Sequence, residues 1–160
     1  SQFKYNASTL LNVQAQNPMQ ILILTYAEVE FIKAELAQRG LIADAAGHYE
    51  KGVRAGIEQL KAVTPAAYFN KPEAQYDGTL ERIMLQKYYA LYFTDYQQWF
   101  EYRRTGFPIL PTTTAMLNDG IMPSRFTYPD NQQIKNNANY LEAVEMVGGD
   151  NINTKVWWDK

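Results

Sequence analysis

Few side chains in this sequence are spaced for catalysis. His48 is the only histidine and cysteine is absent, which excludes sites that need two imidazoles or a thiolate. Glu28 and Glu35 lie seven residues apart and could share one helix face as paired carboxylates for general acid–base chemistry. Because no serine or cysteine is clearly placed to work with His48, we expect this histidine to be structural or solvent-exposed. We likewise expect the two glutamates to be surface charges of an amphipathic helix.

Loops that bind phosphate or calcium are also absent as motifs. Gly148-Gly149-Asp150 lacks the lysine and the following helix of a phosphate-binding loop. The next residues place Ile152 where a calcium loop needs an oxygen ligand. The sequence therefore predicts no catalytic residue, no metal ligand and no cofactor.

Aromatic side chains remain as candidates for binding. Eight of them fall between Tyr88 and Tyr102. Aromatic rings can stack on sugars, but the helical spacing of this run favours a buried core. Exposed aromatics on loops are better candidates, and the loop 63–77 carries three, Tyr68, Phe69 and Tyr76. We expect these three to form part of a ligand site completed by other residues, or to contact a partner protein.

Two further clusters have alternative interpretations. Glu101, Arg103 and Arg104 could clamp an anion, but internal ion pairing is the stronger expectation. Trp157 and Trp158 could stack on a ligand, but paired tryptophans near a terminus more often anchor the chain end on a core.

Charge and hydropathy exclude two classes of partner. The net charge of -2 supplies no positive field for nucleic acid. The longest aliphatic run, Ile21 to Leu24, is far shorter than the ~20 residues of a membrane-spanning helix. We expect one globular domain, or a piece of a larger protein, without a transmembrane span.

The elements that must position these side chains are predicted to be helices. We expect an extended start (1–24), a helical hairpin (25–62), the loop 63–77, a long helix (78–103) and an irregular, loop-rich remainder that serves as a cover (104–160). Thr25 and Glu28 form a capping box at the first helix, and Gly40 ends it. Its predicted buried face carries Val29, Ile32 and Leu36, and that of the second helix carries Ala46, Tyr49, Val53, Ile57 and Leu60.

Glycines and the third helix indicate close packing. Gly47, Gly52 and Gly56 would each cost ~1 kcal/mol in a helix, which close contact between helices would offset. The helix 78–103 is apolar on nearly all sides and is therefore expected to be buried, with Leu91 and Trp99 inside. A hairpin of this kind is typical of tetratricopeptide-like repeats, which need neighbouring repeats. We therefore expect an all-α fold and further helix pairs upstream.

Several motifs, in order, resemble the SusD/RagB family in its SusD-like branch. The first stretch is Thr25 to Val29 with Phe31-Ile32 and Ala34-Glu35. The second is Gln86 to Tyr88, Ala90-Leu91, Trp99, Glu101 and Arg103 to Gly106 with Pro108. The third is Met122-Pro123, Arg125, Tyr128-Pro129, Asn136, Asn139-Tyr140, Gly148 to Asp150 and Thr154 to Asp159.

This resemblance implies the C-terminal portion of a longer, mostly helical protein. Family members bind a nutrient, most often an oligosaccharide or polysaccharide, and are not enzymes. They are attached by a lipidated N-terminal cysteine, absent here, to the outer face of the outer membrane in Bacteroidetes, and they form the lid of a TonB-dependent transporter. One departure is that Gln132 or Gln133 stands where the family has a glutamate, which puts its ion pair with Arg103, Arg104 or Arg125 in doubt.

Two other functions stay open from the sequence. A helical-repeat groove could take peptides or proteins instead of glycans. A hydrolase using the helix carboxylates is disfavoured because no convincing acid–base constellation is present.

Overall fold

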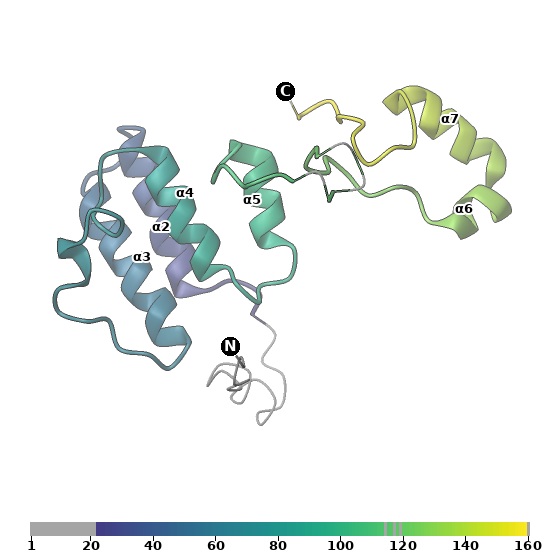
Figure 1. Ribbon diagram of the computed structural model, residues 1–160. Coiled ribbons are helices and arrows are strands. Elements are labelled where there is room, and N and C mark those ends of the chain that lie inside the picture. The colour runs from purple at the N-terminus through teal and green to yellow at the C-terminus, as the bar shows by residue number, and fades with distance from the viewer. Residues whose placement is uncertain (1–21, 114, 117, 119, 160) are drawn as a thin grey trace. The chain divides into compact units, whose positions relative to one another are not determined.

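The computed structural model describes residues 22–113, 115–116, 118 and 120–159, and every regular element within these residues is a helix (Figure 1). The all-α, tetratricopeptide-like prediction is confirmed. The chain divides into two compact units, Ser1–Pro108 and Ile109–Lys160, which we describe separately. No helix in the described part of the chain is both long and apolar enough to cross a membrane.

Helices α2 (Tyr26–Gln38) and α3 (Ala45–Gln59) form the hairpin expected over residues 25–62. The hydroxyl oxygen of Thr25 accepts a hydrogen bond of 3.1 Å from the amide of Glu28, as the capping motif predicts. Gly40 follows the last helical turn at a positive φ of 77°, a conformation that glycine adopts without strain. The side chain of Asp44 caps α3 by accepting a 3.0 Å bond from the amide of Gly47.

The buried face of α2 differs from the predicted one. Ala27, Phe31 and Ala34 are buried, whereas Ile32, expected inside, is 40% exposed. Glu28 and Glu35, expected on the surface, are buried. For Glu35 the prediction was wrong because hydrophobicity alone ranks a glutamate as exposed, while a glutamate that has a cationic partner, here Arg104, can be buried.

The glycines of α3 confirm the close packing in two cases of three. A Cβ atom on Gly52 would lie 3.1 Å from the ring of Phe31 in α2. A Cβ atom on Gly56 would lie 3.0 Å from that of Ala90, in the helix α4 described next. Gly47 instead lies beside its own capping residue, Asp44, and not at a helix crossing. Tyr49 and Val53 of the predicted stripe are buried, but Ala46 is exposed.

The predicted long buried helix 78–103 is wrong, because this region forms two helices, α4 (Leu80–Ala90) and α5 (Gln97–Thr105). Between them Phe93 and Asp95 have positive φ angles of 68° and 49°, and the buried hydroxyl of Thr94 donates to the carbonyl of Leu91. Leu91 is fully buried as predicted, but Trp99 is only half-buried and α5 has no buried residue. The chain therefore turns back after Leu91 and leaves much of its aromatic run at the surface.

The second unit contains the helices α6 (Asp130–Lys135) and α7 (Asn137–Val147). Asp150 organises the unit. Its carboxylate accepts hydrogen bonds from the amide of Tyr128 (3.1 Å) and the hydroxyl of Tyr140 (3.2 Å) and pairs with Arg125 at 3.3 Å. The Gly148-Gly149-Asp150 motif thus has a structural role, with both glycines at positive φ.

The tryptophan pair near the end of the chain does not anchor it on a core of described residues. Trp157 is 85% exposed and Trp158 is 58% exposed, and their rings contact each other edge to face at 5.2 Å. The anchoring prediction is therefore wrong for this part of the chain. That residues 104–160 act as a cover stays a prediction.

Candidate functional site

A neutral groove lies between α3 and α4 in the first unit. Its volume is about 240 Å³, and it is lined by Val53, Gly56, Ile57 and Leu60 on one side, by Gln86, Tyr89 and Ala90 of α4 on another, and by Tyr68 of the short 3-10 helix η1 (Tyr68–Asn70). None of these side chains carries a charge. Gly56 and Ala90 allow the two helices to approach closely at this groove.

The structure separates the three aromatic residues that the sequence singled out. All three are half-buried against the core. Only Tyr68 lines the groove. Phe69 contacts the Tyr68 ring edge to face at 5.3 Å and lies 4.7 Å beneath the guanidinium of Arg54. Tyr76 instead packs on Tyr49, with 5.3 Å between the centres of the two rings.

A buried hydrogen bond fixes the loop 63–77 on α3. The hydroxyl of Tyr49 donates to the carbonyl oxygen of Ala74 at 2.7 Å. Burial raises the pKa of Tyr49 well above its ordinary value, so the phenol stays neutral and remains a donor. The position of η1, and with it that of Tyr68, is therefore tied to the helical core.

Sequence reasoning missed two lining residues, Gln86 and Tyr89. Gln86 is 7% exposed and Tyr89 is 57% exposed. They lie one helical turn apart, which places both on the same face of α4. The helical spacing was visible in the sequence, but only the contact with α3 shows that this face borders a groove.

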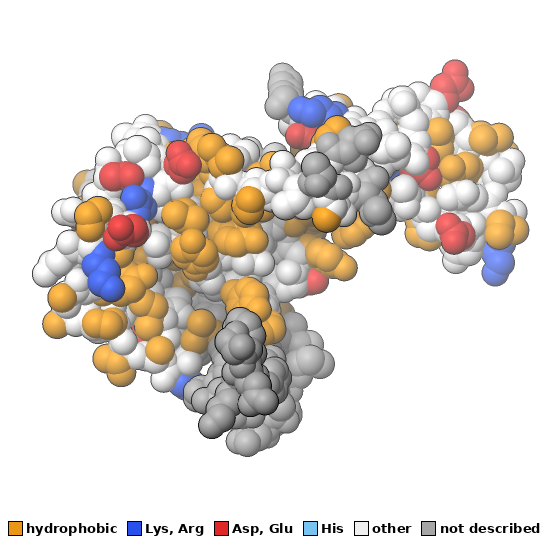
Figure 2. Space-filling view, in the orientation of Figure 1, with side chains coloured by type: hydrophobic (Ala, Val, Ile, Leu, Met, Phe, Trp, Pro, Cys, Tyr) orange, Lys and Arg blue, Asp and Glu red, His pale blue; other side chains and the backbone are white. Residues whose placement is uncertain are grey.

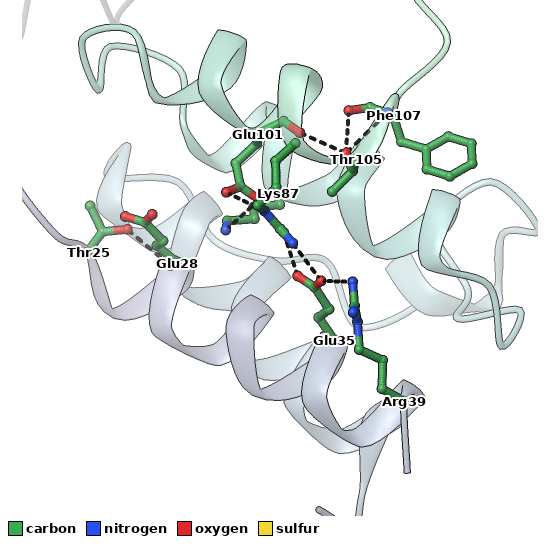
Figure 3. A network of polar contacts seen from close by, with 9 residues as sticks. Thr25, Glu28, Glu35, Arg39, Lys87, Glu101, Thr105 and Phe107 are labelled. Atoms are coloured by element: carbon green, nitrogen blue, oxygen red, sulfur yellow. Dashed lines mark hydrogen bonds and ion pairs between the residues drawn. The ribbon is translucent and has the colours of Figure 1, made fainter. Parts of the chain in front are cut away.

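A network of ion pairs joins α2, α4 and α5 in the same unit (Figure 3). Arg104 donates to both carboxylate oxygens of Glu35, at 2.8 and 2.6 Å, and to Glu101 at 2.8 Å. The fully buried Lys87 pairs with Glu101 at 2.9 Å. The expected internal pairing of Glu101 and Arg104 is present. Arg104 and Arg125 both have acidic partners, Arg125 through Asp150, although a glutamine stands at the position of the family glutamate.

These partners determine the protonation of the carboxylates. Burial alone would raise the pKa of Glu35, but hydrogen bonds from Arg104 and the charges of Arg104 and Arg39 outweigh it and hold the pKa below its usual value. For Glu101, burial is likewise outweighed by Arg104 and Lys87. Both side chains are therefore ionised acceptors with fixed partners, which does not suit a general acid.

A second, more open groove of about 390 Å³ lies along this network, with Glu28, Glu35 and Glu101 among its lining residues. One carboxylate oxygen of Glu28, Oε2, is buried and has no hydrogen-bond partner among the described residues. Nε of Arg103 is also buried without a hydrogen-bond partner among the described residues, and its guanidinium lies 4.8 Å from the centre of the Trp99 ring. Glu28 and Glu35 thus line the same groove but differ in their partners, since only Glu35 is paired with Arg104.

His48 has a structural role, as the sequence predicted. Its Nδ1 lies 2.7 Å from Oε2 of Glu30, a side chain that is only 3% exposed and also pairs with Lys33 at 2.8 Å. Burial would raise the pKa of Glu30, but the bonds from Lys33 and His48 lower it. Among the described residues no cluster of three histidines or carboxylates could hold a metal ion.

Other aromatic side chains are exposed where the chain turns between α4 and α5. Tyr92, Phe93, Tyr96 and Phe100 are 42–51% exposed, and Tyr92 and Phe93 are in contact at 4.4 Å. Hydrophobic side chains are frequent on the face of the first unit seen in Figure 2. Such exposed apolar surface is more than a closed, self-sufficient core would leave.

The profile of the SusD-like family described as "Starch-binding associating with outer membrane" matches residues 1–129. The chain is 37% identical to a solved chitin-binding protein over 84% of its own length and 32% of that protein, with a TM-score of 0.71. No curated protein matches.

Two further solved structures show the same likeness. A SusD homologue from Bacteroides fragilis is 32% identical over 86% of this chain and 35% of its own, with a TM-score of 0.69. A SusD-like protein from Bacteroidetes is 30% identical over 86% of this chain and 30% of its own, with a TM-score of 0.74. The chain thus spans about a third of the length of these relatives. The order of the motifs, the helical fold and these matches together show that the chain belongs to the SusD-like family.

Proposed function

We propose that this chain is the C-terminal part of a glycan-binding protein of the outer membrane that works by binding alone. The observation that carries the proposal is the 37% identity, over 84% of the chain, to a chitin-binding protein. The site supports it in two ways. The network carboxylates Glu35 and Glu101 already have cationic partners, and the neutral groove presents aromatic rings instead of reactive groups.

Within this function, Tyr68, Phe69 and Tyr76 contribute part of a binding surface. Each sugar ring stacked on an aromatic side chain adds only ~0.5–1.5 kcal/mol, so a glycan-binding protein needs several such contacts. The chain spans about a third of its relatives, and the remaining contacts come from the rest of the protein.

Calorimetry on the full-length protein tests this proposal. We expect heat of binding with chitin oligosaccharides or with starch oligosaccharides, and no release of reducing ends after prolonged incubation. New reducing ends would indicate a hydrolase. Binding to a peptide library with no response to any glycan would instead favour the peptide-binding alternative.

We further propose that the protein carries a lipid anchor on an N-terminal cysteine outside this chain and covers a TonB-dependent transporter. Family membership supports both. Co-purification from outer membranes tests the partnership, and the triple variant Tyr68→Ala/Phe69→Ala/Tyr76→Ala separates two roles of the loop. Loss of glycan binding with the transporter retained assigns the loop to the sugar, and the opposite result assigns it to the transporter.

A further inference from the structure

We propose that the groove between α3 and α4 is a subsite for one uncharged sugar ring, with Tyr68 and Tyr89 as its aromatic walls and Gln86 as its polar contact. This inference rests on the proposed glycan-binding function and names a site for it. Tyr68 comes from η1 and Tyr89 from α4, so two separate elements bring aromatic rings to one groove.

The chemistry of the lining selects this class of ligand. A pyranose ring has apolar C–H faces that pack on aromatic rings and hydroxyl groups that need hydrogen-bond partners. The groove supplies aliphatic and aromatic surface together with the side chain of Gln86, which is 7% exposed. No lining residue carries a charge, so the groove offers nothing to pair with an anionic or cationic ligand.

The size of the groove suits a single ring. Its volume of about 240 Å³ lies below the roughly 300–1,000 Å³ of sites that enclose drug-sized molecules. One residue of a longer glycan therefore occupies the groove, while the rest of the chain lies outside it.

The groove is also preorganised. Tyr68 is held by its contact with Phe69, which Arg54 covers, and the loop is tied to α3 by the bond from Tyr49 to Ala74. Gly56 and Ala90 fix the separation of the two helices. Little conformational entropy is then lost when a ring binds, which favours affinity from a small contact.

The test uses the full-length protein and calorimetric titration with chitotriose and maltotriose. We expect Tyr68→Ala and Tyr89→Ala each to weaken binding by about 3–10-fold, as the loss of one aromatic contact predicts. Tyr89→Phe keeps the ring and should retain most of the affinity. Gln86→Leu should weaken binding of the same sugar. Tyr92→Ala is the matched control, because Tyr92 is 51% exposed but does not line the groove, and it should bind like the wild type.

The outcomes are distinguishable. If the wild type binds a glycan but Tyr68→Ala, Tyr89→Ala and Gln86→Leu bind it equally well, the subsite is overturned and the glycan-binding function stands. If the wild type binds neither sugar nor any other glycan, the function and the subsite both fail. Tyr89→Ala could also lower the melting temperature and yet bind the sugar as tightly as Tyr89→Phe and the wild type. Another part of the protein would then pack in the groove, and the proposal would be wrong.

Discussion

Arg104 shows how much of the first unit depends on single polar residues. Its guanidinium joins Glu35 of α2 to Glu101 of α5, and Glu101 in turn satisfies the buried ammonium of Lys87 in α4. A buried lysine without a partner would be very unfavourable, so these four residues stabilise the fold only as a set.

Replacing Arg104 by alanine should lower the stability of the protein by about 1–3 kcal/mol, because it leaves two carboxylates without their main partner. Arg39→Ala is the matched control. Arg39 also contacts Glu35, at 2.7 Å, but its side chain is 52% exposed, and we expect a loss of about 0–1 kcal/mol. Arg104→Lys should lie between the two because lysine cannot form the two-pronged contact. Urea unfolding measures all three, and equal losses for Arg104→Ala and Arg39→Ala would contradict the network.

The same residues predict an acid-sensitive stability. The pKa values of Glu35 and Glu101 are lower in the folded state than the ordinary glutamate value of about 4.3. Between the lowered values and about 4.3 the unfolded chain binds more protons than the folded one, so stability is full above this range and falls as the pH decreases through it. The melting temperature should decline below about pH 4.5. Glu35→Gln should be less stable at pH 7 and decline less steeply in acid, and an acid slope as steep as that of the wild type would exclude Glu35 as a cause.

At the scale of elements, close helix packing decides where the groove lies. Gly52 lets α3 contact Phe31 of α2, and Gly56 lets it contact Ala90 of α4. The turn after Leu91 then separates α4 from α5, so that Arg104 reaches Glu35 from a second helix. A single helix over residues 78–103 would instead carry Glu101 along the axis of α4, away from Lys87.

We expect Gly52→Ala to be destabilising by about 1–3 kcal/mol, although alanine normally improves a helix by ~1 kcal/mol over glycine. The added methyl group would lie 3.1 Å from three atoms of the Phe31 ring. In a Phe31→Leu background the same substitution should cost less, and thermal unfolding of the four proteins of this cycle measures the coupling. Additive effects would show that Gly52 does not act through Phe31.

At the scale of the molecule, the chain consists of two compact units and spans about a third of its solved relatives. The first unit leaves Ile32 40% and Leu41 70% exposed next to its buried glutamates. A helical repeat buries its second face only against neighbours, so we expect further helices of the full-length protein to cover this face. Among the described residues of the second unit none is buried, and the contacts of Asp150 hold its segments together instead.

Asp150→Ala should loosen the second unit by about 1–3 kcal/mol, because it removes the acceptor of two hydrogen bonds and the partner of Arg125. Hydrogen exchange followed by mass spectrometry should show faster exchange at the amide of Tyr128 and in α7. Asp130→Ala, at an exposed carboxylate in α6, is the control and should exchange like the wild type. Unchanged protection of Tyr128 in Asp150→Ala would contradict this role.

The sequence by itself determined the features that depend on near neighbours in the chain. The start of α2 at Thr25 and its end at Gly40 follow from caps and spacings within a few residues, and both were predicted. The family was also identified from the sequence, because its motifs occur in order along the chain. Part of the candidate site was also predicted, since Tyr68 was singled out as a loop aromatic and it lines the groove.

Only the tertiary structure decided which faces are buried and where the groove lies. Glu35 is buried because Arg104, 69 residues further along the chain, reaches it, and no local pattern contains that partner. The chain breaks after Leu91 although its apolar spacing continues, and Thr94 is buried at the turn. Gln86 and Tyr89 become site residues only because Gly56 lets α3 approach α4. In each case the free energy of a side chain depends on atoms far away in sequence, which hydrophobicity and spacing do not record.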